Sequence, residues 1–147
     1  MRHRKKTVKL GRTSEHRDAL LSSLVCNLIQ RRRITTTLAK AKAARSLADK
    51  MVTLAKRNTL YSRRRAVSIL RRKEAVAALF GEIAPSLQDR NSGYTRILKL
   101  GRRPSDSSEM AILEWVNYVP PAPKKDKEKG GKQKKEAGTG REASAAS

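Results

Sequence analysis

The amino-acid sequence predicts a two-layer α+β protein in which helices pack on a small three-stranded sheet. Apolar residues recur at three- and four-residue spacing through most of the first 84 residues, which is typical of amphipathic helices. Two later stretches rich in β-branched and aromatic residues are joined by a short polar link, which indicates a β-hairpin. An earlier β-branched run can supply a third strand. The expected order is therefore helix, strand, three helices and hairpin.

The first helix is predicted to begin at Ser14, a suitable N-cap residue. Glu15 and Asp18 lie in its first turn, where the helix dipole favours carboxylates. The run Arg31–Arg33 ends it, because cations suit the C-terminal end of a helix. Cys26 lies within its apolar pattern and is expected to be a small core residue. The apolar stripe comprises Leu20, Leu21, Leu24, Val25, Leu28 and Ile29.

The segment Ile34–Thr37 contains β-branched residues throughout and reads as a short strand. Thr37 can also cap a second, longer helix from about Leu38 to Arg57, and Asn58 is a suitable residue to stop it. The opposite side of this helix is basic. Its expected buried side comprises Leu38, Ala41, Ala44, Leu47, Ala48, Met51, Leu54 and Ala55.

Two shorter helices are expected next. Ser62 is the predicted cap of a third helix that continues to about Leu70. A fourth helix is predicted from about Lys73 to Ala84, ending before Pro85 because the residue before a proline disfavours the helical conformation. Gly81 weakens its last turn.

The hairpin follows a polar segment from Leu87 to Gly93. Its predicted strands are Tyr94–Leu100 and Met110–Tyr118, joined by the polar residues of Pro104–Ser108. Two strands alone are marginally stable, so Ile34–Thr37 is expected to complete the sheet.

The chain divides into three parts. Residues 1–12 form a basic arm, residues 13–119 the α+β domain, and residues 120–147 a tail that is expected to be disordered because it lacks large apolar side chains. The formal net charge of the 147 residues is +22. Only a small part of this charge belongs to the tail, so it is a property of the domain and its arm.

This charge favours a polyanionic partner, with nucleic acid first and an anionic membrane surface second. No apolar run approaches the ~18 residues of a membrane span, so the chain is expected to be cytosolic and not to enter a membrane. Cys26 is the sole cysteine and His3 and His16 are the sole histidines, which leaves no disulfide and no predicted metal site. No cofactor and no small-molecule substrate are expected.

Catalysis is not expected either. The glycines in the folded part are isolated, so no phosphate-binding loop can be recognised. Ser14, His16 and Asp18 resemble a hydrolytic triad by residue type alone, because residues two apart on a helix point to different sides. The chain is predicted not to be an enzyme.

Basic runs occur on successive elements with few counter-charges, which indicates RNA binding. Arginine forms bidentate contacts with phosphate and stacks on exposed bases, so arginine-rich runs suit folded RNA. Motifs for reading DNA grooves, such as a zinc finger or a basic helix leading into a leucine heptad, are not found in the sequence. Some arginine triplets can equally be solvent-exposed only. The runs are 2–12, 31–33, Lys40 with Lys42, 63–65, 71–73 and 96–103.

Several motifs in register resemble the bacterial large-subunit ribosomal protein family numbered seventeen (L-seventeen). The resemblance covers Met1 to about Val119, and the tail lies outside it. The motifs are Met1–Lys5, Gly11–Arg17, Ile34–Lys42, Asp49–Leu54 and Gly93–Lys99.

The resemblance implies a structural constituent of the large ribosomal subunit that binds 23S rRNA near the rim of the polypeptide exit tunnel. It also implies one copy per subunit rather than a homo-oligomer, neighbouring large-subunit ribosomal proteins as further partners, and no catalysis. A nucleoid-type DNA-binding protein and a ribosome assembly factor are the alternative functions.

The resemblance also implies which residues contact RNA. Tyr94 belongs to the matching strand motif, although its ring can equally serve in packing. The basic arm adds Lys6 and Lys9, and one basic run adds Arg63 and Arg64. The residues carried over by the motifs are Arg2, His3, Arg4, Lys5, Gly11, Arg12, His16, Arg17, Thr35, Thr36, Lys40, Lys42, Tyr94, Arg96 and Lys99.

The proposed mode of action is assembly by charge neutralisation. The arm threads between RNA helices, where each Lys or Arg replaces condensed counterions. The folded domain acts as a rigid wedge. Its expected buried residues are Leu24, Leu28, Leu47, Leu54, Phe80 and Ile97.

Overall fold

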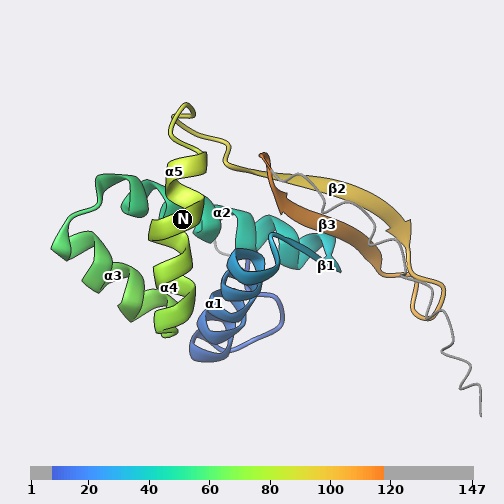
Figure 1. Ribbon diagram of the computed structural model, residues 1–147. Coiled ribbons are helices and arrows are strands. Elements are labelled where there is room, and N and C mark those ends of the chain that lie inside the picture. Colours follow the sequence, from blue (N-terminus) through green and yellow to red (C-terminus); the bar gives the residue numbers. More distant parts are fainter. Residues whose placement is uncertain (1–7, 118–147) are drawn as a thin grey trace, which may run out of the picture.

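The computed structural model describes residues 8–117. Most of the predicted basic arm and the whole predicted tail lie outside these residues. The fold class is confirmed, since helices pack with a three-stranded antiparallel sheet (Figure 1). The elements are α1 Ser14–Arg31, β1 Arg33–Thr37, α2 Leu38–Arg57, α3 Leu60–Leu70, α4 Lys73–Ala78, the π-helical segment η1 Leu79–Ile83, α5 Ala84–Ser86, β2 Thr95–Arg102 and β3 Glu109–Trp115.

The helix ends follow local backbone chemistry, with two corrections to the predicted caps. Thr13, not Ser14, occupies the N-cap position of α1. Thr59, not Ser62, caps α3, and its Oγ1 accepts a hydrogen bond of 3.1 Å from the Ser62 amide. Asn58 ends α2 in the left-handed conformation, as predicted, because a short polar side chain tolerates positive φ.

The predicted fourth helix is divided, and Pro85 lies inside the helical path rather than beyond its end. A π-helical turn separates α4 from α5, and the Ala84 amide donates to the Leu79 carbonyl five residues earlier. Pro85 falls in the first turn of the short α5, where a backbone N–H is not required. The change of hydrogen-bonding register therefore lets the chain accept a proline that would break a continuous helix.

The sheet has the order β1-β3-β2, with both pairs antiparallel. The predicted hairpin and the predicted role of the early strand are confirmed, and β3 is the central strand. The hairpin extends away from the helices (Figure 1). Strand β2 continues to Arg102 through a bulge at Leu100, where Gly101 has a φ of +95°. Tyr118 of the predicted strand lies outside the described residues.

The core lies among the helices and continues between α2 and one face of the sheet. Helix α2 contacts all three strands, and α1 packs beside it. Ala41, Ala44 and Ala48 of α2 are fully buried, so neighbouring backbones approach closely there. Cys26 is buried in this core, as predicted. Its burial raises the pKa of the thiol, although nearby Arg72 opposes the shift.

The predicted burial of the six residues of the folded domain is only partly confirmed. Leu28 is fully buried, whereas five others pack against the margin of the core and are partly exposed. Those five are Leu24, Leu47, Leu54, Phe80 and Ile97. Among the described residues, no helix is both long and apolar enough to cross a membrane.

Candidate nucleic-acid interface

Two adjoining grooves lie where the start of α2 meets the hairpin. The first is lined by Val8 from the end of the arm, by Thr37 and Lys42, and by Ser108 from the hairpin. The second is lined by Lys99 and Arg102 of β2. Leu38 and the exposed carboxylate of Glu109 border both grooves. The fold therefore brings together basic side chains that lie some 60 residues apart in the chain.

The start of α2 is suited to an anion. Its first turn contains no acidic residue, and the Thr37 side chain does not accept a hydrogen bond from the helix amides. The free N–H groups and the positive end of the dipole therefore remain available, with Lys42 exposed beside them. Thr36 faces α2, whereas Thr35 lies on the opposite face of the sheet, as the register with β3 requires.

One carboxylate is buried at the other end of β3, between two arginines. Glu114 is 2% exposed. The Arg96 Nε lies 2.5 Å from Glu114 Oε1, and the Arg33 Nε lies 3.3 Å from Glu114 Oε2. Both arginines stand directly opposite Glu114 in the sheet register, one on each neighbouring strand. We call these three residues the Glu114 cluster.

The Glu114 cluster belongs to the sheet face that α2 leaves uncovered. Ala111, Leu113 and Trp115 point into the core, so Ile112 and Glu114 point away from it. Thr35 and Leu98 flank Ile112 on this face, and Leu98 is exposed. A small apolar surface therefore continues along the sheet from the two arginines.

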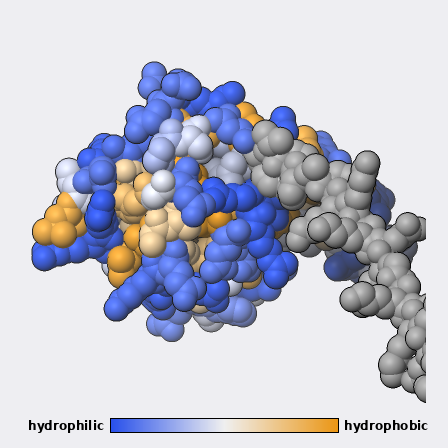
Figure 2. Space-filling view, in the orientation of Figure 1, coloured by the Kyte–Doolittle hydropathy of each residue, from blue (hydrophilic) through white to orange (hydrophobic). Residues whose placement is uncertain are grey.

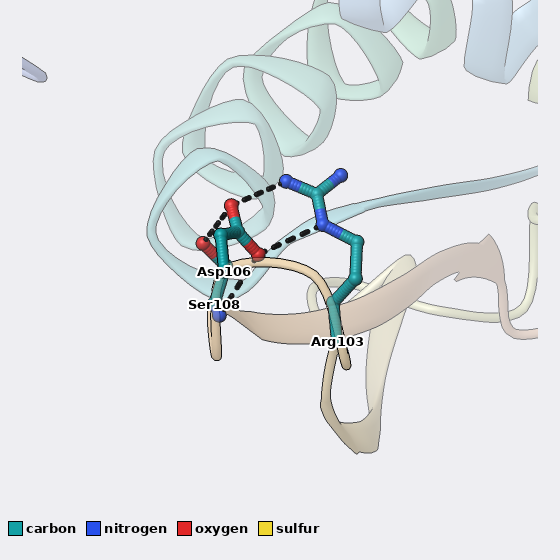
Figure 3. Close-up of polar contacts among 3 residues, drawn as sticks. All are labelled: Arg103, Asp106 and Ser108. Carbon is teal, nitrogen blue, oxygen red and sulfur yellow. Dashed lines mark hydrogen bonds and ion pairs between the residues drawn. The ribbon is translucent and has the colours of Figure 1, made fainter.

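A second arginine–carboxylate pair fixes the hairpin turn, residues 103–108 (Figure 3). Arg103 donates from Nε and Nη2 to the two oxygens of Asp106, at 2.9 and 2.6 Å. The Ser108 amide and hydroxyl also donate to Asp106. These bonds, led by the one from Arg103, lower the pKa of the Asp106 carboxyl well below its ordinary value.

Helix α3 lies apart from these features, at the far end of the molecule from the hairpin (Figure 1). Arg63 donates to the Asn58 side chain and lies over the Phe80 ring at 5.4 Å, so part of it serves packing within the protein. Arg64 is exposed. Apolar surface is visible at this edge of the molecule (Figure 2), and the exposed apolar residues of α3 are Leu60, Tyr61 and Val67.

The last residues of the predicted arm, 8–12, lead directly into the start of α1. Gly11 has a φ of +64° in a turn, which favours glycine. Arg12 donates from Nη1 to the Leu10 carbonyl, and its Nε is buried without a partner within residues 8–117. Lys9 and His16 are exposed, and Arg17 donates to the Ser14 hydroxyl. Arg2, His3, Arg4, Lys5 and Lys6 lie outside the described residues.

Tyr94 is the clearest departure from the predicted RNA-contacting set. The residue is 2% exposed, and its hydroxyl donates to the Asn91 carbonyl at 2.8 Å. Lys56 lies over the ring at 4.7 Å from the centroid. Packing, the alternative that the sequence left open, therefore accounts for this residue.

The structure thus collects Lys42 and Lys99 at one site and leaves Arg63, Arg64, His16 and Arg17 elsewhere. Sequence reasoning missed Glu114, whose one signal is an acidic residue directly after the apolar run Met110–Leu113. It recognised Arg33 and Arg102 only as members of basic runs. In the part of the chain that is described, no three His, Cys, Asp or Glu side chains are grouped so as to hold a metal ion.

Comparison with known proteins agrees with the resemblance seen in the sequence. A family model described as Ribosomal protein L17 matches residues 20–116. The large ribosomal subunit protein bL17 of Methylacidiphilum infernorum is 52% identical over 116 residues, which are 79% of this chain and 88% of the relative. The bL17 protein of Thermodesulfovibrio yellowstonii is 51% identical over 128 residues, covering 87% of this chain and 96% of the relative.

Proposed function

This chain belongs to the ribosomal protein L17 family, and from that premise we propose that it is a structural constituent of the large ribosomal subunit that binds 23S rRNA. It acts in the cytoplasmic ribosome, beside other large-subunit proteins and near the rim of the exit tunnel. Its role is to hold RNA rather than to catalyse a reaction, and each subunit contains one copy.

The observation that carries the RNA-binding part of the proposal is the pair of grooves at the start of α2. Lys42, Lys99 and Arg102 approach a helix start whose first turn has no acidic residue. These three cations outnumber Glu109, the one carboxylate among the described residues that line the two grooves. Backbone N–H groups and flexible cations together favour phosphate groups. The end of the arm reaches the same place through Val8, so the arm and the folded domain can act on one stretch of RNA.

Co-sedimentation with purified large subunits in high salt tests this function. We expect one copy per subunit to remain bound, because the protein is embedded in RNA. Substoichiometric amounts that are lost in high salt would instead favour an assembly factor. Competition at fixed salt between 23S rRNA and duplex DNA supplies the second test, and a preference for DNA would favour the nucleoid-type alternative.

Deletion of Met1–Arg12 tests the arm. The folded domain buries its core without these residues, so the truncated chain should keep its helical circular dichroism. Its incorporation into large subunits should fall by roughly tenfold or more, because six basic residues that can displace counterions are removed. Undiminished incorporation of a folded, truncated chain would contradict the arm model.

A further inference from the structure

We propose that the open face of the sheet is a further RNA-backbone site, in which Glu114 positions Arg33 and Arg96 for phosphate. This inference rests on the proposed function and adds a site to it. An acidic residue at an RNA-binding surface is expected to weaken binding by repulsion. Glu114 is proposed to strengthen binding, because it orients two cations.

The geometry supports a positioning role. Glu114 stands on the central strand, and the two arginines reach it from the two edge strands. Each arginine contacts the carboxylate through Nε, at 2.5 Å for Arg96 and 3.3 Å for Arg33. A guanidinium carries five N–H donors, so a carboxylate cannot use all the donors of two arginines.

Exposure separates the carboxylate from the arginines. The Glu114 side chain is 3% exposed, whereas those of Arg33 and Arg96 are 40% and 52% exposed. A ligand that approaches this face therefore meets the guanidinium groups and not the carboxylate. The cluster has two positive charges and one negative charge, so it keeps a net positive charge for an anion.

The neighbouring surface indicates which anion fits. Ile112 and Leu98 continue along the same face, and Leu98 is exposed beside the nearly buried Ile112. A sugar–phosphate backbone presents charged groups next to less polar sugar and base surfaces, and arginine also binds phosphate by bidentate contacts. Nucleic-acid backbone therefore matches the chemistry of the face better than a free phosphate ion.

The test compares Glu114→Gln with Glu74→Gln in the full-length chain. Glu74 lies on α4, away from both grooves and from the sheet, is exposed, and serves as the matched control for loss of one negative charge. Binding to deproteinised 23S rRNA is measured by filter retention over a range of salt concentrations. Glu114→Gln should weaken binding about tenfold and make the salt dependence shallower by about one to two counterions. Glu74→Gln should leave binding unchanged or slightly tighter.

Two further variants separate positioning from folding. Glu114→Asp keeps the charge and should restore most of the affinity. Arg33→Lys combined with Arg96→Lys keeps both positive charges but removes the guanidinium groups, and should weaken binding to the same extent as Glu114→Gln. If circular dichroism shows that Glu114→Gln is unfolded, Glu114→Asp and the double lysine variant still test the proposal.

The outcomes distinguish the site from the function. If the unaltered chain prefers duplex DNA to 23S rRNA, the proposed function is wrong. If the unaltered chain prefers 23S rRNA but folded Glu114→Gln binds as tightly or more tightly, only the role of Glu114 is overturned. Undiminished binding by the double lysine variant would overturn it as well.

Discussion

The two ends of the sheet contain the same chemical pair in opposite surroundings. At one end, Glu114 is buried between two strands, and its arginines lie 18 and 81 residues away in the chain. At the hairpin turn, Asp106 is 45% exposed and pairs with Arg103, three residues earlier. Burial strengthens an electrostatic interaction but also makes an unpaired group costly, whereas water screens an exposed pair. The buried pair therefore ties strands together, and the exposed pair only shapes a turn.

The largest expected effect is the loss of the buried carboxylate. Glu114→Gln leaves two arginines without their counter-charge and should lower the free energy of unfolding by about 2 kcal/mol, less than for a fully buried pair because the arginines are half exposed. Urea denaturation followed by circular dichroism measures it. Glu109→Gln should change the free energy of unfolding little, because Glu109 is exposed. An equal loss of stability in both variants would contradict the claim that burial makes Glu114 the more important acid of β3.

An intermediate effect is expected at Gly101, in the bulge of β2 close to the hairpin turn. Its φ of +95° is disfavoured for side chains with a Cβ, although an added Cβ would meet no atom within 4 Å. Gly101→Ala should therefore lower the free energy of unfolding by about 1 kcal/mol through backbone strain alone. Gly81→Ala is the matched control, since its Cβ also meets open space without a positive φ. If Gly101→Ala leaves the free energy of unfolding unchanged, the backbone of the bulge adjusts to the added Cβ and the strain argument is wrong.

The smallest expected effect belongs to Asp106. Asp106→Asn should leave global unfolding unchanged, because the group is exposed, but it should speed amide exchange at Ser108, which donates to this carboxylate. Protonation should act in the same way. The pKa of Asp106 is lowered, so its contribution is complete above the ordinary value of 3.8 and is lost as pH falls through the lowered value. Carboxyl chemical shifts that titrate near 3.8 would contradict this.

Local patterns in the sequence predicted most of the secondary structure. The apolar spacing of α1 and α2, the left-handed stop at Asn58 and the two hairpin strands depend on residues close together in the chain. The division of the fourth helix could not be predicted in the same way. A π-helical turn forms when the Ala84 amide donates to the carbonyl five residues earlier instead of four. The apolar spacing around Gly81 is compatible with both hydrogen-bonding registers.

The candidate interface was predictable in part. The junction residues Lys40 and Lys42 follow a strand directly, so a basic helix start could be anticipated there. The meeting of Lys99 with Leu38, and the pairing of Arg33 with Glu114, depend on strand order. Sequence alternation does not specify whether β1 lies beside β2 or β3, so these contacts needed the structure.

The central place of β3 has a consequence for synthesis. Strands β1 and β2 are both paired to β3, and β3 is the last of the three to be translated. Neither edge strand can form its ladder until residues 109–115 have left the ribosome, although α1 and α2 are complete long before. The positions of Arg33 and Arg96 opposite Glu114 are therefore fixed only after β3 has emerged, and the two cations are not held together in the nascent chain before then.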